Sequence, residues 1–310
     1  MEYNVLLYYK FVSITDPQAV RDEHYAKCQA LNLKGRILIA TEGINGTVSG
    51  LKADTQAYME WMSQHELFAG TEFKIDEYDS HAFLKLHVRV KHEVVRFNLP
   101  DAVQQYGTGK FVEPAEFRQV LKEAETNPNI VILDTRSEYE FSVGKFKHAV
   151  TLPIDNFREL TDCMDEMEAL RGKQIYSYCT GGIRCEKITG WLENQGFDMY
   201  QLHGGIIRYG QEMGGEDFDG QCYVFDQRVV VPINQVNPNV IGHCFVCDNP
   251  TEKMINCANA LCNNHILMCE TCFHELEGCC CEECTHSPQK RTFNPDGYFL
   301  RGVNSKSYLT

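Results

Sequence analysis

Between about residue 111 and residue 215, short apolar segments alternate with longer amphipathic ones, and this alternation constrains the fold more than any other feature. "NIVILDT", "KQIYSYC" and "MYQLHGG" have the length and composition of strands, whereas "PAEFRQVLKEAE", "FRELTDCMDEMEAL" and "EKITGWLENQG" have helical patterns. Strands that alternate with helices form parallel sheets. We therefore expect an α/β domain whose functional site lies at the carboxyl edge of its sheet.

A loop rich in glycine and cysteine follows the strand "KQIYSYC" and consists of Cys179, Thr180, Gly181, Gly182, Ile183, Arg184 and Cys185. A strand, a turn and a helix in this order direct backbone N–H groups and the positive end of the helix at one point. These donors and the Arg184 charge are expected to lower the pKa of the Cys179 thiol. The pattern therefore predicts a nucleophilic cysteine in an anion-stabilising loop.

Three other interpretations of this loop remain. In the first, Cys179 is only a small apolar residue at a strand end. The second concerns Cys185, which either only caps the following helix or resolves a persulfide or sulfenate on Cys179. The third is a phosphatase, which needs an arginine six places after its cysteine. Here that place holds Cys185 and the arginine comes one place earlier, which argues against a phosphatase.

The segments "ILDTRSEYEFSVGKFKHAVTLPIDNFREL", "YSYCTGGIRCEKITGWLENQGF" and "LHGGIIRYG" resemble a rhodanese domain over about residues 112–215. With "KGRILIATEGINGTVSG", "FDGQCYVFDQRVVVP" and the cysteine-rich end, the whole chain resembles the bacterial tRNA uridine hydroxylase (TrhO) family. This resemblance implies oxygen-dependent formation of 5-hydroxyuridine at the wobble position of tRNA. It implies tRNA and dioxygen as substrates, and we expect a thiol or another reductant as a further partner.

The resemblance also assigns residue roles. The persulfide-carrying cysteine of the rhodanese pattern matches Cys179, and the second cysteine of the family loop matches Cys185. Asp134 and Arg136 match an Asp-x-Arg at the end of the neighbouring strand. The alternative for Arg136 is a purely structural ion pair with Glu138 or Glu140.

Residues 1–98 predict a different domain. "YNVLLYYKFVSI" has a strand pattern, and "DPQAVRDEHYAKCQALN" a helix opened by Asp16. "GRILIATEGINGTVSG" predicts a hairpin with its turn around Gly43 to Gly46, and a second helix and further strands follow. This order predicts a ferredoxin-like (acylphosphatase-like) α+β domain, with an extra strand.

Ten of the fifteen cysteines lie between residues 244 and 284, several of them as CxxC pairs. Paired thiolates at this spacing predict two tetrahedral zinc sites, with eight ligands: Cys244, Cys247, Cys257, Cys262, Cys269, Cys272, Cys281 and Cys284. An interleaved grouping joins Cys244 and Cys247 with Cys269 and Cys272, and a consecutive grouping is equally compatible with the spacing. Reduced or disulfide-linked cysteines that pack a small subdomain are the alternative.

Basic residues with interleaved aromatics are typical of single-stranded RNA binding. The tail predicts such contacts at Lys290, Arg291, Arg301 and Lys306, unless it packs back on the body of the protein. A second basic row lies within the segment "KLHVRVKHEVVRF" and consists of Lys85, Arg89, Lys91 and Arg96. Local rows are needed because the net charge of −14 disfavours RNA binding through overall charge.

The 310 residues divide into a ferredoxin-like domain at 1–98, a rhodanese domain at 111–220, a connecting strand with a cysteine-rich domain at 221–286, and a basic tail at 287–310. No basic leader precedes the first apolar segment, and no apolar run approaches the ~20 residues of a membrane span, so we expect a cytoplasmic protein. The sequence carries no flavin, haem, nucleotide or iron-binding motif. Two other functions remain: a sulfurtransferase that passes a persulfide from Cys179, and a non-enzymatic RNA- or protein-binding adaptor.

Overall fold

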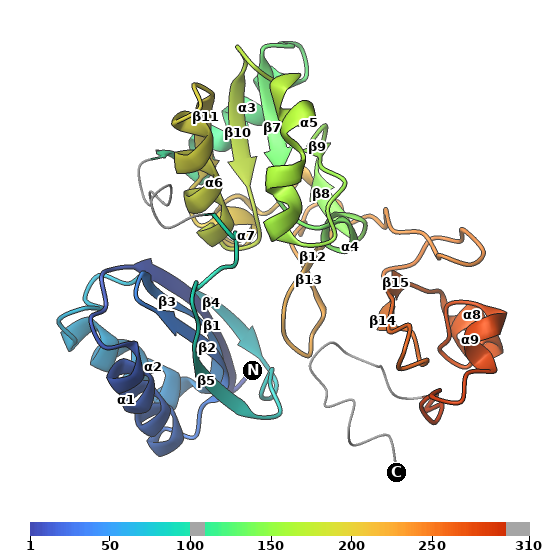
Figure 1. Cartoon of the computed structure of the whole chain (residues 1–310), viewed down its shortest axis with the longest axis horizontal. Coiled ribbons are helices and arrows are strands. Elements are labelled where there is room, and N and C mark those ends of the chain that lie inside the picture. Colours follow the sequence, from blue (N-terminus) through green and yellow to red (C-terminus); the bar gives the residue numbers. More distant parts are fainter. Residues whose placement is uncertain (100–108, 296–310) are drawn as a thin grey trace.

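The computed structural model describes residues 1–99 and 109–295, which form an amino-terminal domain, a central domain and a cysteine-rich end (Figure 1). The elements of the amino-terminal domain are β1 (Tyr3–Phe11), α1 (Pro17–Ala30), β2 (Lys34–Ala40), β3 (Gly43–Leu51), α2 (Lys52–Gln64), β4 (Phe73–Tyr78) and β5 (Leu86–Val90). Their sheet order is β4-β1-β3-β2-β5, with β5 parallel to β2 and the other pairs antiparallel. The predicted ferredoxin-like topology with an extra strand is confirmed.

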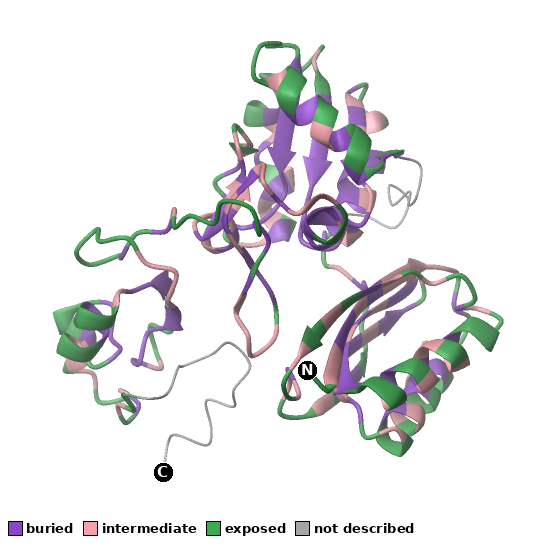
Figure 2. Cartoon of the chain, turned by 180° about the vertical axis from the view of Figure 1, so that it is seen from behind, coloured by how far each residue is buried: buried purple, intermediate pink, exposed green. Residues whose placement is uncertain are grey.

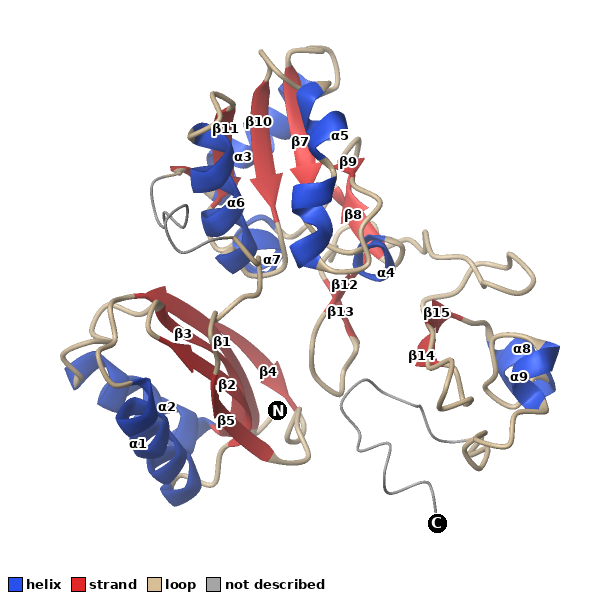
Figure 3. Ribbon diagram, in the orientation of Figure 1, coloured by secondary structure: helices blue, strands red, loops and turns tan. Residues whose placement is uncertain are grey.

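Both helices of this domain cover the same face of the sheet (Figure 3). Side chains alternate between the faces of a strand, so Leu6 and Tyr8 of β1 are buried in the core with the helices. Leu7 and Tyr9 consequently lie on the opposite face. That face is the one directed toward the central domain, because Leu7 packs against the core of that domain.

The β2–β3 hairpin is present, but its turn was predicted at the wrong place. The strands are joined at Thr41 and Glu42, and Gly43 to Gly46 lie within β3. Gly46 is required there because a Cβ atom at this position would lie 2.3 Å from the ring of Tyr8 on the neighbouring strand. The glycine that suggested a turn instead permits close contact across the sheet.

The central domain contains β6 (Lys110–Val112), α3 (Pro114–Ala124), β7 (Ile130–Asp134), α4 (Glu138–Phe141), β8 (Gly144–Phe146), β9 (Val150–Thr151), a 3₁₀ segment (Phe157–Asp162), α5 (Met164–Glu168), β10 (Gln174–Tyr178), α6 (Ile183–Glu193), β11 (Asp198–Leu202) and α7 (Gly205–Met213). Its sheet has the order β6-β11-β10-β7-β9, and all pairs are parallel. The predicted parallel α/β sheet is confirmed.

Two apolar cores enclose this parallel sheet, one on each face. Alternate residues of β7 belong to different cores, with Ile132 in one and Val131 and Leu133 in the other. The buried strands are visible at the centre of the domain in Figure 2. The carboxyl ends of β7 and β10 point toward the amino-terminal domain (Figure 1), so the edge expected to carry the site faces a second domain.

The remaining strands connect the central domain to the cysteine-rich end. Strand β12 (Phe218–Tyr223) pairs with β13 (Val230–Pro232) and with β8, so the connecting segment is part of a sheet with the central domain. The cysteine-rich end holds β14 (Met254–Asn256), β15 (His265–Leu267), α8 (Glu270–Glu275) and α9 (Glu282–Thr285). Its small core consists mainly of cysteine side chains. Within the described residues, no helix has the length and apolar character needed to cross a membrane.

Candidate active site

The loop that begins at Cys179 follows β10 and leads into α6, as the sequence predicted. Gly182, with a φ of 103°, is the N-cap of α6, and its backbone N–H donates to the Cys179 Sγ at 3.1 Å. Cys179 and Cys185 are both free thiols and fully buried. The loop therefore holds the sulfur of Cys179 against a backbone donor at the start of a helix.

The environment of the two thiols separates their pKa values. Burial raises the pKa of Cys179, but the hydrogen bond from Cys185, the Arg184 charge and the N–H groups of Arg184 and Cys185 outweigh it. The result is a pKa of about 5 for the Cys179 thiol. Burial and the neighbouring sulfur of Cys179 raise the pKa of Cys185 well above its usual range. Cys179 is consequently the thiolate of the pair and Cys185 its thiol donor.

Arg184 is fixed by a carboxylate that sequence reasoning did not connect with it. Its guanidinium makes a bidentate ion pair with Glu140 of α4, with N–O distances of 2.6 and 2.8 Å, and donates to Thr180 Oγ1 at 3.1 Å. Glu140 is fully buried and Arg184 is 7% exposed. Arg184 thus places a fixed positive charge beside Cys179, with most of its hydrogen-bond donors already engaged.

Asp134 and Arg136, the residues of the Asp-x-Arg pattern, form an ion pair with each other. Both side chains are fully buried, and the guanidinium contacts the carboxylate at 2.9 and 2.6 Å. Arg136 also donates to the backbone oxygen of Gly144 at 2.6 Å. The alternative of a structural ion pair therefore named the wrong carboxylate, because Arg136 binds Asp134 and Glu140 binds Arg184. This pair ties the end of β7 to β8.

The amino-terminal domain contacts α6, the helix that follows the cysteine loop, which the sequence did not indicate. Tyr9 of β1 donates its hydroxyl to Glu186 of α6 at 2.7 Å. Lys187 of α6 pairs with Glu42 at 3.0 Å and with Glu93 at 2.7 Å. These bonds join residues about 90 to 180 positions apart, so no local sequence pattern could reveal them.

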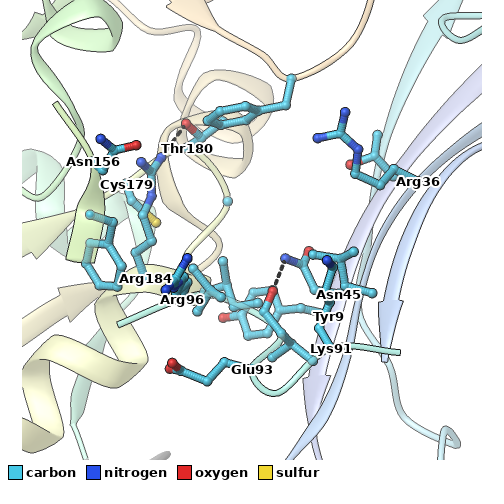
Figure 4. Close-up of a pocket in the computed structure, with 18 of the residues that line it drawn as sticks. Tyr9, Arg36, Asn45, Lys91, Glu93, Arg96, Asn156, Cys179, Thr180 and Arg184 are labelled. Carbon is cyan, nitrogen blue, oxygen red and sulfur yellow. Dashed lines mark hydrogen bonds between the residues drawn. The ribbon is translucent and has the colours of Figure 1, made fainter. Parts of the chain in front are cut away.

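A cavity of about 690 Å³ lies between the two domains, with the cysteine loop along one wall (Figure 4). Cys179, Thr180 and Arg184 line it from the central domain. The amino-terminal domain supplies three exposed cations, which we call the basic rim: Arg36, Lys91 and Arg96. Aromatic rings also line the cavity, among them Tyr9, Phe83, Tyr139 and Phe225. The cavity thus combines a reactive sulfur with cations and rings that suit a nucleotide.

The structure divides the residues of the predicted basic row. Lys91 and Arg96 belong to the basic rim, whereas Lys85 and Arg89 do not line the cavity. Arg36 joins them from β2, although the sequence did not single it out. Half of the predicted row thus lines the cavity, and its contact with RNA stays a prediction.

The structure corrects the prediction for the tail at Arg291. This side chain is 5% exposed and donates to the backbone oxygen of Cys257 at 2.9 Å and to Asn263 Oδ1 at 2.7 Å. Lys290 forms an ion pair with Glu277. Arg291 is buried against the cysteine-rich end and is therefore not available to RNA. Arg301 and Lys306 lie outside the described residues.

The cysteines of the carboxyl-terminal part form two groups of four. One group contains Cys244, Cys247, Cys269 and Cys272, and the other contains Cys257, Cys262, Cys280 and Cys284. Within each group all sulfur atoms lie within 4.8 Å of one another. The grouping is thus the interleaved one, and each group could hold a metal ion.

One cysteine of this arrangement differs from the prediction. Cys281 is exposed and lies outside the second group, and Cys280 takes its place. Cys281 is the N-cap of α9, whose first turn brings Cys284 back toward Cys280, with 3.7 Å between their sulfur atoms. The CxxC spacing of Cys281 and Cys284 suggested the wrong partner, because Cys280, four places before Cys284, supplies the sulfur of the second group.

Gly205, the first residue of α7, packs against the backbone of the cysteine loop. Its φ is 66°, and a Cβ atom there would lie 2.5 Å from the backbone oxygen of Cys179. We expect Gly205→Ala to lower the free energy of unfolding by at least about 3 kcal/mol, because left-handed strain adds to a backbone clash. Urea denaturation followed by Trp191 fluorescence, in a Trp61→Phe background, measures this change.

The matched control is Gly172→Ala in the same domain. Gly172 has a φ of 81°, but nothing lies within 4 Å of the position of its Cβ. It therefore reports the left-handed strain alone, which is roughly 1–2 kcal/mol. Equal losses for the two variants would contradict a specific contact between Gly205 and the cysteine loop.

Comparison with known families agrees with this three-part architecture. Residues 3–94 match the UPF0176 acylphosphatase like domain, residues 116–212 the rhodanese-like domain, and residues 219–285 the rhodanase C-terminal family. A rhodanese-like domain protein from Staphylococcus aureus of known structure is 25% identical and covers 34% of this chain and 94% of its own. The TM-score of this match is 0.27.

Curated relatives match over most of the chain. A tRNA uridine(34) hydroxylase from Cytophaga hutchinsonii is 48% identical over 304 residues, which are 98% of this chain and 96% of the relative. A protein of the same name from Listeria monocytogenes is 52% identical over 246 residues, which cover 78% of this chain and 76% of the relative. With this identity over nearly its full length, the chain belongs to the tRNA uridine(34) hydroxylase family.

Proposed function

We propose that this protein is an oxidoreductase that hydroxylates the wobble uridine of tRNA to 5-hydroxyuridine, with dioxygen as co-substrate and Cys179 as the nucleophile. The similarity to relatives named tRNA uridine(34) hydroxylase supports the reaction. The observation that carries the proposal is the interdomain cavity, which is lined by Cys179 and by the basic rim. Its volume of about 690 Å³ falls within the range of about 300–1,000 Å³ typical of small-ligand sites.

Each part of the cavity has a role in this reaction. A wobble uridine already lies in a single-stranded loop, so it enters a pocket at a small cost in unpairing. The basic rim contacts the phosphates on either side of it, and the aromatic rings offer surfaces on which bases stack. The thiolate of Cys179, maintained by its low pKa of about 5, is then available to react at neutral pH without prior loss of a proton.

Mass spectrometry of nucleosides tests the reaction directly. We expect tRNA from cells that lack the gene to lose an oxygen on the wobble uridine, and the purified protein to restore it in the presence of dioxygen and a thiol reductant. Loss of a sulfur atom instead would identify a sulfurtransferase. The match to the rhodanese-like domain and the thiolate in its loop favour that second function, which would carry a persulfide on Cys179.

We also propose that the two cysteine groups bind structural zinc. Zinc–thiolate bonds of about 2.3 Å in a tetrahedron place the sulfur atoms about 3.8 Å apart. The S–S distances of 3.5 Å between Cys247 and Cys269 and 3.6 Å between Cys262 and Cys280 are close to this value. Four thiolates leave no open position, which is typical of structural and not catalytic zinc.

The second group contains Cys280 and not Cys281, and this difference gives the assignment of structural zinc a sharp test. We expect about two zinc ions per wild-type chain and about one in Cys280→Ser, because three thiolates hold zinc less tightly than four. Cys281→Ser, the matched control one residue away, is expected to keep about two. Elemental analysis of protein purified without chelator measures all three. Loss of zinc from the Cys281 variant instead would contradict the grouping in the structure.

A further inference from the structure

A single peptide unit of the cysteine loop is held at both of its ends. The N–H of Gly182 donates to the Cys179 Sγ at 3.1 Å. The carbonyl oxygen of Gly181, on the other side of the same peptide bond, accepts from the Lys74 Nζ at 3.1 Å. The C=O and N–H of a trans peptide point in opposite directions, so the ammonium, the peptide and the sulfur lie in sequence.

Lys74 belongs to the amino-terminal domain and is placed in an unusual environment for a lysine. It lies on β4, the edge strand next to β1, and it is 6% exposed. Its ammonium lies 4.8 Å from the centre of the Tyr9 ring. Among the described residues no carboxylate forms a salt bridge with it, although buried lysines are rarely left without one. The loop carbonyl is thus its main hydrogen-bond acceptor.

We propose that Lys74 is a positioning residue for Cys179, which acts through the Gly181–Gly182 peptide and places a positive charge behind it. The bond to the Gly181 oxygen fixes the orientation in which the Gly182 N–H points at the sulfur. A cation at the carbonyl oxygen also polarises the peptide, which makes its N–H a stronger donor. This inference rests on the proposed role of Cys179 as the nucleophile.

The charges around both groups are consistent with this role. Burial lowers the pKa of Lys74 to about 8, whereas Glu72, Cys179 and Glu186 raise it and Arg208 lowers it further. Lys74 is therefore mostly cationic at neutral pH. The groups that act on Cys179 are chiefly Cys185 and Arg184, which lower its pKa against burial. Lys74 approaches the same loop from the opposite side, because Arg184 is held by α4 and Lys74 comes from β4.

This arrangement divides the reactive centre between two domains. The central domain supplies the loop, Arg184 and both cysteines, and the amino-terminal domain supplies the buried ammonium and part of the cavity lining. Reactivity of Cys179 therefore depends on the contact between the domains, which the 3.1 Å bond from Lys74 to the loop helps to maintain.

The test measures the protonation of Cys179 in the full chain without any tRNA. Iodoacetamide is applied over about pH 4 to 9, and the modified cysteines are quantified by mass spectrometry. Trypsin cleaves after Lys173 and Arg184, so Cys179 lies in the peptide 174–184 and Cys185 in a separate one. NMR titration of ¹³Cβ-labelled cysteine, assigned with Cys179→Ser, reads the same thiol without the need for reagent entry.

We expect Lys74→Met to move the midpoint of the Cys179 titration upward by about one pH unit, which slows alkylation roughly tenfold below the midpoint. The midpoint moves upward because the loss of a nearby cation makes the thiolate of Cys179 less favourable. Lys74→Arg, which retains the charge, is expected to stay close to the wild-type midpoint. Lys52→Met removes the same charge from an exposed residue paired with Glu77 and is expected to leave the midpoint unchanged.

Two outcomes would overturn the proposal. The first is a folded Lys74→Met protein with the wild-type midpoint. The second is an equal shift in Lys74→Met and Lys74→Arg, because altered packing and not charge would then be the cause. Neither outcome depends on hydroxylation of tRNA, so failure of this inference is distinguishable from failure of the proposed function.

Discussion

Cys179→Ser is expected to reduce formation of 5-hydroxyuridine by at least about a thousandfold, the scale of removing a nucleophile from an enzyme. A serine hydroxyl retains the size of the thiol, but it does not ionise near neutral pH and cannot carry a persulfide. The surrounding loop is expected to stay folded, because the Gly182 N–H can donate to a hydroxyl oxygen as it does to the sulfur. Nucleoside mass spectrometry after incubation with unmodified tRNA measures the rate.

Cys163→Ser is the matched control for this experiment. Cys163 lies in the same domain, is 5% exposed and does not line the cavity, and burial raises the pKa of its thiol. The control is expected to retain the wild-type rate. A Cys179→Ser protein that modifies tRNA as fast as the control would show that the loop does not supply the nucleophile.

The cysteine loop could be predicted from the sequence because its determinants are local. A buried strand, Cys179, two glycines and the start of a helix are consecutive, and each restricts the backbone of its neighbours. The low pKa of Cys179 follows largely from those neighbours, since Cys185 and Arg184 both belong to the first turn of α6. The ferredoxin-like topology was predictable for a similar reason, because the order of strands and helices is itself visible in the sequence.

The contacts between the two domains could not be predicted, because they depend on how the domains meet. Lys74 and Gly181 are 107 positions apart, and β4 carries no pattern that distinguishes its buried lysine from an exposed one. Arg36 was overlooked because a single arginine on a strand usually faces solvent. The choice of Glu140 for Arg184, and not for Arg136, likewise depends on where α4 lies relative to the loop.

Neutralising the basic rim is expected to weaken tRNA binding at least about tenfold and to flatten its dependence on salt. Arg36→Gln, Lys91→Gln and Arg96→Gln together remove up to three phosphate contacts, which lowers the slope of log K against log salt by roughly 2 for a single strand. The effect is large because the protein carries a net charge of −14, so long-range repulsion must be overcome locally. The rim acts within a Debye length of ~8 Å.

Three exposed cations away from the cavity provide the control: Lys52, Lys122 and Arg171, each changed to Gln. This triple variant has the same net charge as the rim variant, so any difference between the two reports position and not total charge. Binding is measured by titration of labelled tRNA at several salt concentrations. We expect the control to lose little affinity and to keep its salt slope, since these three residues do not line the cavity proposed to bind the anticodon loop. Equal losses in the two variants would mean that tRNA binding depends only on the overall charge, and the interdomain cavity would then not be its binding site.

Alkylation of Cys179 in the rim variant shows whether the rim also affects the thiol. An unchanged alkylation rate together with weaker tRNA binding assigns the rim to tRNA binding and not to the reactivity of Cys179.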